Sequence, residues 1–234
     1  IDRYDQNSAN YKVRLEAPSM DHWMGTDEFG RDIWSRIVHG ARLSVTVAFI
    51  SVFFGTGTGL ILGVVSGYLG GMADRLIQRI VEIMIAMPAI LLALALMATL
   101  GAGVDKVILA LSILNPWFTA RIIRASVLSI KQNAYIDAAQ VIGVPTFTIM
   151  LRHILPNVMP VYLIIVSSLL GTVILVESSL SYLGLGVPPP HPSWGRMLSG
   201  AAENYAVTAP WMVIIPGLAI TWLTVGFNLF GDTL

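Results

Sequence analysis

The sequence predicts an all-α polytopic membrane protein with five visible transmembrane helices. Of its 234 residues, 55% are hydrophobic and only 12% are charged, whereas a soluble domain usually carries about 25% charged residues. A domain of this size still needs a large wetted surface, so the missing charge indicates that lipid is the solvent. The alternative, an unusually apolar soluble protein, fits this composition poorly. The net charge of zero provides no basic field for nucleic acid, and the absence of cysteine excludes disulfides and thiolate metal sites.

Five stretches are long and apolar enough for helices that cross a bilayer, which takes about 20 residues. Four of them contain no Asp, Glu, Lys, Arg or His, namely 43–73, 83–104, 154–176 and 206–231. The fifth, 107–130, contains Arg121 and Arg124, and long basic side chains near a helix end can reach the membrane interface. All five are predicted to span the membrane.

The first 42 residues are polar and hold six of the fourteen basic residues. Apolar residues then recur at helical spacing, at Trp34, Ile37, Val38 and Ala41. Asp32 and Arg36 are predicted to form an i,i+4 ion pair on the other side of the same helix. We expect the segment 1–42 to end in an amphipathic helix that lies in the membrane interface. An ordinary surface helix fits the pattern equally well.

Glycine occurs at every fourth position of the first apolar stretch, at Gly55, Gly59, Gly63, Gly67 and Gly71. On a helix these residues form one strip, which lets another helix backbone approach closely. A flexible helix, or a chance run in a glycine-rich chain, is the alternative. Phosphate binding is excluded, because no Gly-Lys-Ser/Thr follows and the segment is apolar. We therefore predict that this strip packs against a neighbouring helix.

The segment 131–156 has the pattern of two short helices between two spans. The first helix has one face made of Tyr135, Ala138, Ala139 and Ile142, and the second has one made of Phe147, Met150, Leu151 and Ile154. Gly143 is placed just past a helix end, and Pro145 where the next helix would begin. Such an elbow, with a shoulder of small residues, suits docking into a groove on a partner. A connector with no partner fits the pattern about as well.

At this elbow the sequence resembles a known motif. Asp137-Ala138-Ala139, then Gly143, then His153-Ile154-Leu155-Pro156 resembles the EAA loop of ABC importer permeases, with Asp137 in place of the usual Glu and His153 in place of the usual Ile. In that family the loop is a coupling helix that seats on the ATPase subunit. The resemblance implies that the ATPase-coupling residues are Tyr135, Asp137, Ala138, Ala139, Gly143, His153, Leu155 and Pro156. Asp137 would fix the register of the elbow, and the small residues would keep it thin.

Two further motifs narrow the resemblance. The run MGTDEFGRD at 24–32 precedes the first visible span, and ESSLSYLGLG at 177–186 precedes the PSWG of 192–195. With the elbow, they resemble the C-type permease of dipeptide, oligopeptide and nickel importers. That implies six spans in the intact protein, with one before Ile1. It also divides the chain into an extracytoplasmic segment, 1–42, and a transmembrane permease domain, 43–234. Within that domain the elbow would be cytoplasmic, and the 184–205 loop would lie outside. The distribution of Lys and Arg gives this topology mixed support. Cytoplasmic loops usually carry more basic residues, whereas here eight would lie outside and six inside.

The resemblance implies a subunit of an ATP-driven importer in the bacterial inner membrane. Its expected partners are a second homologous permease that shares the translocation path, two ATPase subunits, an extracytoplasmic solute-binding protein and the lipid bilayer. The chain contains no Walker motif, so ATP and Mg would be bound by the partner subunits, with no catalytic residue or cofactor here. Di- or oligopeptides are the expected cargo, while glutathione-like peptides, nickel chelates and small sugars stay open.

Four other interpretations remain. Glu177 ends a long apolar run, so its carboxylate either lines the path or lies in water at the outer interface. The four histidines show no ligand spacing, which argues against a metal site; they are His22, His39, His153 and His191. A secondary transporter would need inverted repeats, and none is evident. An intramembrane protease would need a nucleophile and a base at membrane depth, and Ser199-Gly200 lacks a Gly-x-Ser-Gly setting.

Overall fold

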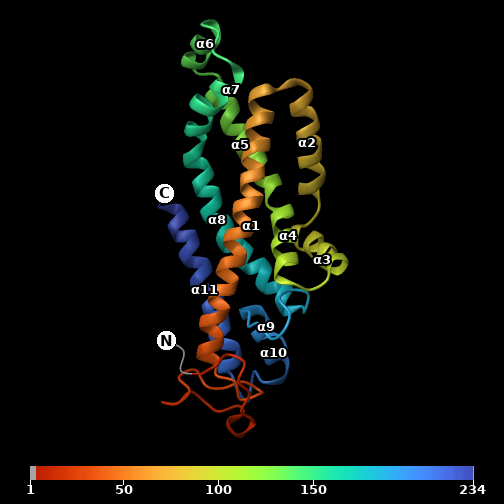
Figure 1. Ribbon diagram of the computed structural model, residues 1–234, viewed down its shortest axis with the longest axis vertical. Coiled ribbons are helices and arrows are strands. Elements are labelled where there is room, and N and C mark those ends of the chain that lie inside the picture. Colours follow the sequence, from red (N-terminus) through yellow and green to blue (C-terminus); the bar gives the residue numbers. More distant parts are fainter. Residues whose placement is uncertain (1–3, 234) are drawn as a thin grey trace.

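Helices account for most of residues 4–233, which are the residues that the computed structural model describes (Figure 1). The ends of the predicted 1–42 and 43–234 segments, at 1–3 and 234, lie outside them. In chain order the helices are η1 (Tyr11–Val13), α1 (Ile33–Leu69), α2 (Gly71–Ala86), α3 (Ala89–Leu100), α4 (Val104–Leu114), α5 (Pro116–Lys131), α6 (Ala134–Val141), α7 (Thr146–Ile149), the π-helical turn η2 (Met150–Ile154), α8 (Leu155–Tyr182), α9 (Trp194–Leu198), α10 (Ala201–Asn204) and α11 (Trp211–Asp232).

The first span is longer at its start and shorter at its end than the apolar stretch 43–73 predicts. The Asp32 side chain caps α1 by accepting the backbone N–H of Ser35 at 2.9 Å. The helix then runs without a break to Leu69 and ends at Gly70, whose φ of 67° is left-handed. The predicted interfacial helix is therefore the first turns of α1, continuous with the span.

The predicted ion pair between Asp32 and Arg36 is wrong. Because Asp32 is the capping residue, its carboxylate faces the helix N-terminus, where it also lies 2.9 Å from Nδ1 of His22. The nearest carboxylate oxygen to Nε of Arg36 belongs instead to Asp27, at 3.7 Å. The acidic partner of Arg36 therefore comes from the loop before α1, and not from the i,i+4 position that the helical spacing predicted.

The predicted span 83–104 is not one straight helix. It contains the end of α2 and all of α3, which meet at an angle of 90° across Met87 and Pro88. Proline lacks a backbone N–H and disfavours helical backbone in the residue before it, and Met87 is extended, with ψ of 130°. The described residues hold four helical segments long and apolar enough to span, or five if this bent pair counts as one.

The other spans follow the prediction, with shifted ends. The spanning helices cover Val104–Lys131, Thr146–Tyr182 and Trp211–Gly231. The 184–205 loop contains the short helices α9 and α10. α1 packs along α5 and also against α4 and α8, and α8 packs against α11. Figure 1 shows α6 and α7 at one end of this bundle, with α9, α10 and the residues before α1 at the other. We call these the elbow end and the loop end.

Candidate functional site

The turn inside the elbow is fixed by its backbone. α6 ends at Val141, and Gly143 follows with φ of +81°. The N–H of Gly143 donates to the carbonyl of Gln140 at 3.0 Å, and the N–H of Val144 donates to that of Ala139 at 3.0 Å. These two bonds form a Schellman motif, which places a glycine just past the helix end. The structure therefore has the helix end that the sequence predicts at this glycine.

The elbow has a buried side and an exposed apolar side. Ile136, Ala139, Ile149 and Ile154 are buried in a cluster with the elbow ends of α1, α5 and α8. The opposite side exposes large apolar side chains, namely Tyr135 (45%), Val141 (86%), Ile142 (79%), Phe147 (70%) and Leu151 (47%). Each predicted face is thus divided. Ala139, Ile154 and the half-buried Met150 pack inward, while the other residues predicted on these faces are exposed.

The residues assigned to ATPase coupling occupy different environments. Four are exposed, namely Asp137, Ala138, Gly143 and Pro156, in addition to Tyr135. His153 and Leu155 are half-buried, and Ala139 is buried. The rings of Tyr135 and His153 lie 6.2 Å apart between centroids, which brings α6 against η2. Among the described residues, no hydrogen-bond or ion-pair partner of the Asp137 side chain occurs, so its carboxylate is available to a partner.

Proline explains why the elbow joins α8 through a π-helical turn. Pro156 provides no N–H for the carbonyl of Arg152, and its ring would crowd that carbonyl in a regular α-helix. The wider turn of η2, Met150–Ile154, avoids this clash. The Asn157 side-chain amide donates to the carbonyl of His153 at 2.6 Å, which satisfies one of the displaced acceptors.

Three residues that the sequence did not single out tie the elbow to α1. Nζ of Lys131, at the end of α5, donates to the carbonyl of Tyr68 at 2.8 Å and lies 5.3 Å from the centroid of its ring. The side-chain amide of Gln140 in α6 donates to the Tyr68 hydroxyl at 3.4 Å. All three line a cavity of about 370 Å³ beneath the elbow. Tyr68 is distant in sequence from both partners, so no local pattern reveals this contact.

The glycine strip lies at the contact between α1 and α5. A Cβ built on Gly59 would lie 2.5 Å from the carbonyl oxygen of Pro116, and one on Gly63 would lie 2.7 Å from Cβ of Ile123. Gly55 and Gly67 have similar contacts, with Asn115 and Val127. Gly71 does not belong to the strip. It is the first residue of α2, with φ of +58°, and a Cβ there would meet nothing within 4 Å.

Glu177 lies in neither of the environments that the sequence left open. Its side chain is 1% exposed, which excludes plain water at the outer interface. The Ser44 hydroxyl donates to one carboxylate oxygen at 3.1 Å, and the Ser181 hydroxyl donates to the other at 2.7 Å. Within this chain Glu177 therefore joins α1 to α8 and lines no open path. Within residues 4–233, no group of three or more His, Asp or Glu side chains is arranged to hold a metal ion.

A substitution at Gly143 should act through the backbone and not through size. A Cβ at this position would meet nothing within 4 Å, but the positive φ strains every residue with a side chain except Asn and Asp. We expect Gly143→Ala and Gly143→Leu to weaken the elbow by the same amount, about 1 kcal/mol, and Gly143→Asn to be milder. ATP-dependent uptake by the assembled transporter measures the effect. A loss confined to leucine would show that thinness at the partner surface is the constraint.

Comparison with known proteins identifies the chain. Residues 59–234 match the family described as binding-protein-dependent transport system inner membrane component. The dipeptide transport system permease protein DppC of Alkalihalophilus pseudofirmus is 42% identical over 96% of this chain and 74% of its own length. The glutathione transport system permease protein GsiD of Escherichia coli O1:K1 is 41% identical, over 99% of this chain and 76% of its own length.

Solved structures agree on the fold. An inward-facing structure of the MetNI methionine ABC transporter has a chain that superposes with a TM-score of 0.71 at 21% identity, covering 86% of this chain and 94% of that one. An amino acid ABC transporter gives a TM-score of 0.59 at 17% identity, covering 85% and 94%. Neither a secondary transporter nor an intramembrane protease finds support in these matches. The chain belongs to the binding-protein-dependent transport system inner membrane component family and is a multi-pass permease subunit of an ABC importer.

Proposed function

We propose that this permease carries di- or oligopeptides and is driven through its elbow by separate ATPase subunits. The relatives named for dipeptide and glutathione transport support a peptide cargo. The elbow end is then cytoplasmic, and the loop end faces the extracytoplasmic solute-binding protein. A second homologous permease completes the translocation path, and two ATPase subunits bind the ATP and Mg.

The exposed apolar side of the elbow is the observation that carries this proposal. Five large apolar side chains are exposed on α6, the turn after it, α7 and η2, and the free carboxylate of Asp137 lies on the same α6 helix. Contiguous exposed apolar surface at the end of a bundle marks a site of protein contact. The ATPase-coupling role of the eight predicted residues rests on this surface, with Asp137 as its charged contact.

The other side of the elbow supplies the mechanical connection. Ile136 and Ile154 are fully buried with residues of α1, α5 and α8, and Lys131 and Gln140 bind the end of α1. Closely packed interiors transmit displacement because they deform little. Movement of the ATPase subunits on ATP binding would therefore displace α1, α5 and α8 together with the elbow.

Co-purification with the ATPase subunits tests the exposed apolar side. Phe147→Ser removes the ring of a residue that is 70% exposed on the elbow. We expect a loss of about 2 kcal/mol in binding, or roughly a thirtyfold weaker complex, because buried aromatic side chains dominate such interfaces. Val207→Ser is the matched control, since Val207 is 93% exposed at the loop end. Equal recovery of ATPase subunits with both variants would contradict the proposed role of the elbow.

A further inference from the structure

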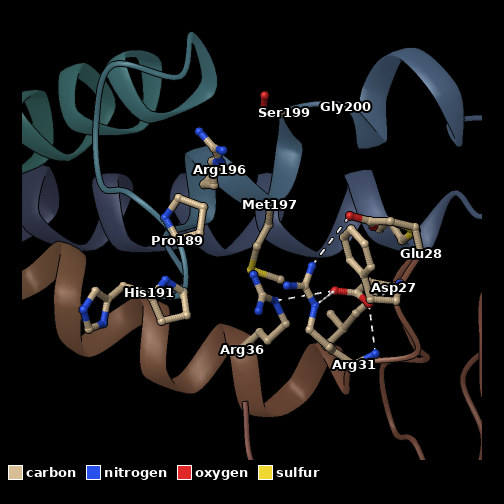
Figure 2. A pocket seen from close by; sticks show the side chains of 14 residues that line it. Asp27, Glu28, Arg31, Arg36, Pro189, His191, Arg196, Met197, Ser199 and Gly200 are labelled. Carbon is tan, nitrogen blue, oxygen red and sulfur yellow. Dashed lines mark hydrogen bonds and ion pairs between the residues drawn. The ribbon is translucent and has the colours of Figure 1, made fainter. Parts of the chain in front are cut away.

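A charged cavity at the loop end lies between two segments that are far apart in sequence. It has a volume of about 450 Å³ and is lined by residues 27–36, around the start of α1, and by residues 189–200, from the proline loop and α9. Figure 2 shows Arg31 and Arg36 side by side near Asp27, with Arg196 on the other side of the cavity. Three arginines and two acidic residues thus line one partly open cavity.

The two carboxylates are committed to two of the three arginines. Asp27 accepts Nε of Arg31 at 2.6 Å, and Glu28 lies 3.6 Å from the same guanidinium. Arg36, which is 5% exposed, lies 3.7 Å from Asp27 and donates to the carbonyl of Gln6 at 3.2 Å. Within the described part of the chain, no carboxylate pairs with Arg196. The lining therefore has three arginines and two carboxylates, which leaves one positive charge, that of Arg196, without a paired carboxylate among the described residues.

The backbone that carries Arg196 is held firmly. The Ser193 side chain caps α9 by accepting the N–H of Arg196 at 3.3 Å. The indole N–H of Trp194 donates to the carbonyl of Ile37 in α1 at 3.0 Å. A Cβ on Gly195 would lie 2.0 Å from the carbonyl oxygen of Ser178, so α9 packs directly on the backbone of α8. Such support reduces the conformational entropy lost when the arginine binds a ligand.

We infer that this cavity receives an acidic side chain of the extracytoplasmic binding protein. A guanidinium presents paired donors that match a carboxylate, and the charge of the half-buried Arg196 is screened less than one on a fully open surface. The family description names a binding protein on which transport depends, and the segments that line this cavity, before α1 and around α9, lie at the end opposite the elbow (Figure 1). The inference rests on the proposed orientation of the chain.

Charge reversal at Arg196 tests the inference in the complete transporter, with both permeases and both ATPase subunits in lipid nanodiscs. The readout is the concentration of cargo-loaded binding protein that gives half-maximal stimulation of ATP hydrolysis. We expect Arg196→Glu to raise it about tenfold and Arg196→Lys to raise it about threefold or less, since a paired charge is lost in one and kept in the other. The Arg196→Glu effect should shrink in high salt.

Lys12→Glu is the matched control, because it makes the same charge change at an exposed residue of the loop end outside the cavity. An equal shift for both variants, or none for Arg196→Glu, would overturn the inference while leaving the transport function intact. A normal half-maximal concentration with reduced cargo uptake would also overturn it, because the carboxylate would then belong to the cargo. If binding protein fails to stimulate even the wild-type complex, the proposed function itself is wrong.

Discussion

Gly59→Ala is expected to lower the free energy of unfolding of the permease by about 3 kcal/mol. A methyl group at Gly59 would lie 2.5 Å from the carbonyl oxygen of Pro116 and 2.7 Å from Cβ of Thr119. Neither a backbone oxygen nor a Cβ can move without separating α1 from α5, so the full overpacking penalty applies. Thermal unfolding of the purified transporter in nanodiscs measures the change.

Gly57→Ala is the matched control for this prediction. Gly57 lies two residues away on the same helix, and a Cβ there would meet nothing within 4 Å. Alanine favours a helix over glycine by about 1 kcal/mol, so this variant should be neutral or slightly more stable. Similar destabilisation by both substitutions would show that the strip acts through helix flexibility and not through close packing.

Asp74→Leu is expected to destabilise the fold by about 2 kcal/mol, because it leaves the charge of Arg124 without its partner. The carboxylate of Asp74 in α2 accepts Nε and Nη2 of Arg124 in α5, each at 2.6 Å. The hydroxyl of Ser66 in α1 also donates to it, so one acidic side chain joins three helices. The partners are 19% and 30% exposed, which keeps the effect below that of a fully buried pair.

The double variant Asp74→Leu, Arg124→Leu should be less destabilised than the sum of the two single variants, since neither charge is then left alone. Glu82→Leu is the control, because it breaks an exposed pair with Arg79 at 3.7 Å. Its expected effect is within about 0.5 kcal/mol. Additive effects at Asp74 and Arg124 in denaturant or thermal unfolding would contradict a coupled pair.

Periodic features of the sequence predicted the fold best. Four glycines at i,i+4 spacing identified a helix contact before its partner helix was known, and Gly143 marked the end of α6. Long apolar stretches located four spans, since length and hydropathy are properties of the segment itself. The bend at Pro88 was missed because an apolar count gives no weight to a single residue that breaks the helix.

Contacts between distant segments could not be predicted from any local pattern. Arg124 was interpreted as a side chain that reaches the membrane interface, but it pairs with Asp74, 50 residues away. The sequence could not decide whether Glu177 lines the path or lies in water. Its hydrogen-bond donor Ser44 lies 133 residues earlier, so no local pattern indicates their contact. The faces of the elbow were misassigned for a related reason. Alanine and isoleucine occur on both the buried and the exposed side of a short helix. Which side of the elbow is buried depends on its packing against Tyr68 and Val127.

The unbroken course of α1 has a geometric consequence for transport. Its 37 residues correspond to about 55 Å at 1.5 Å per residue, which exceeds the hydrocarbon thickness of about 30 Å. The helix is therefore long enough to carry Arg36, near its start, and Tyr68, near its end, to opposite surfaces of the membrane. Pivoting this rod by about 10° at its midpoint would shift its two tips by about 5 Å in opposite directions. A single stiff element is thus long enough to couple events on the two sides of the bilayer.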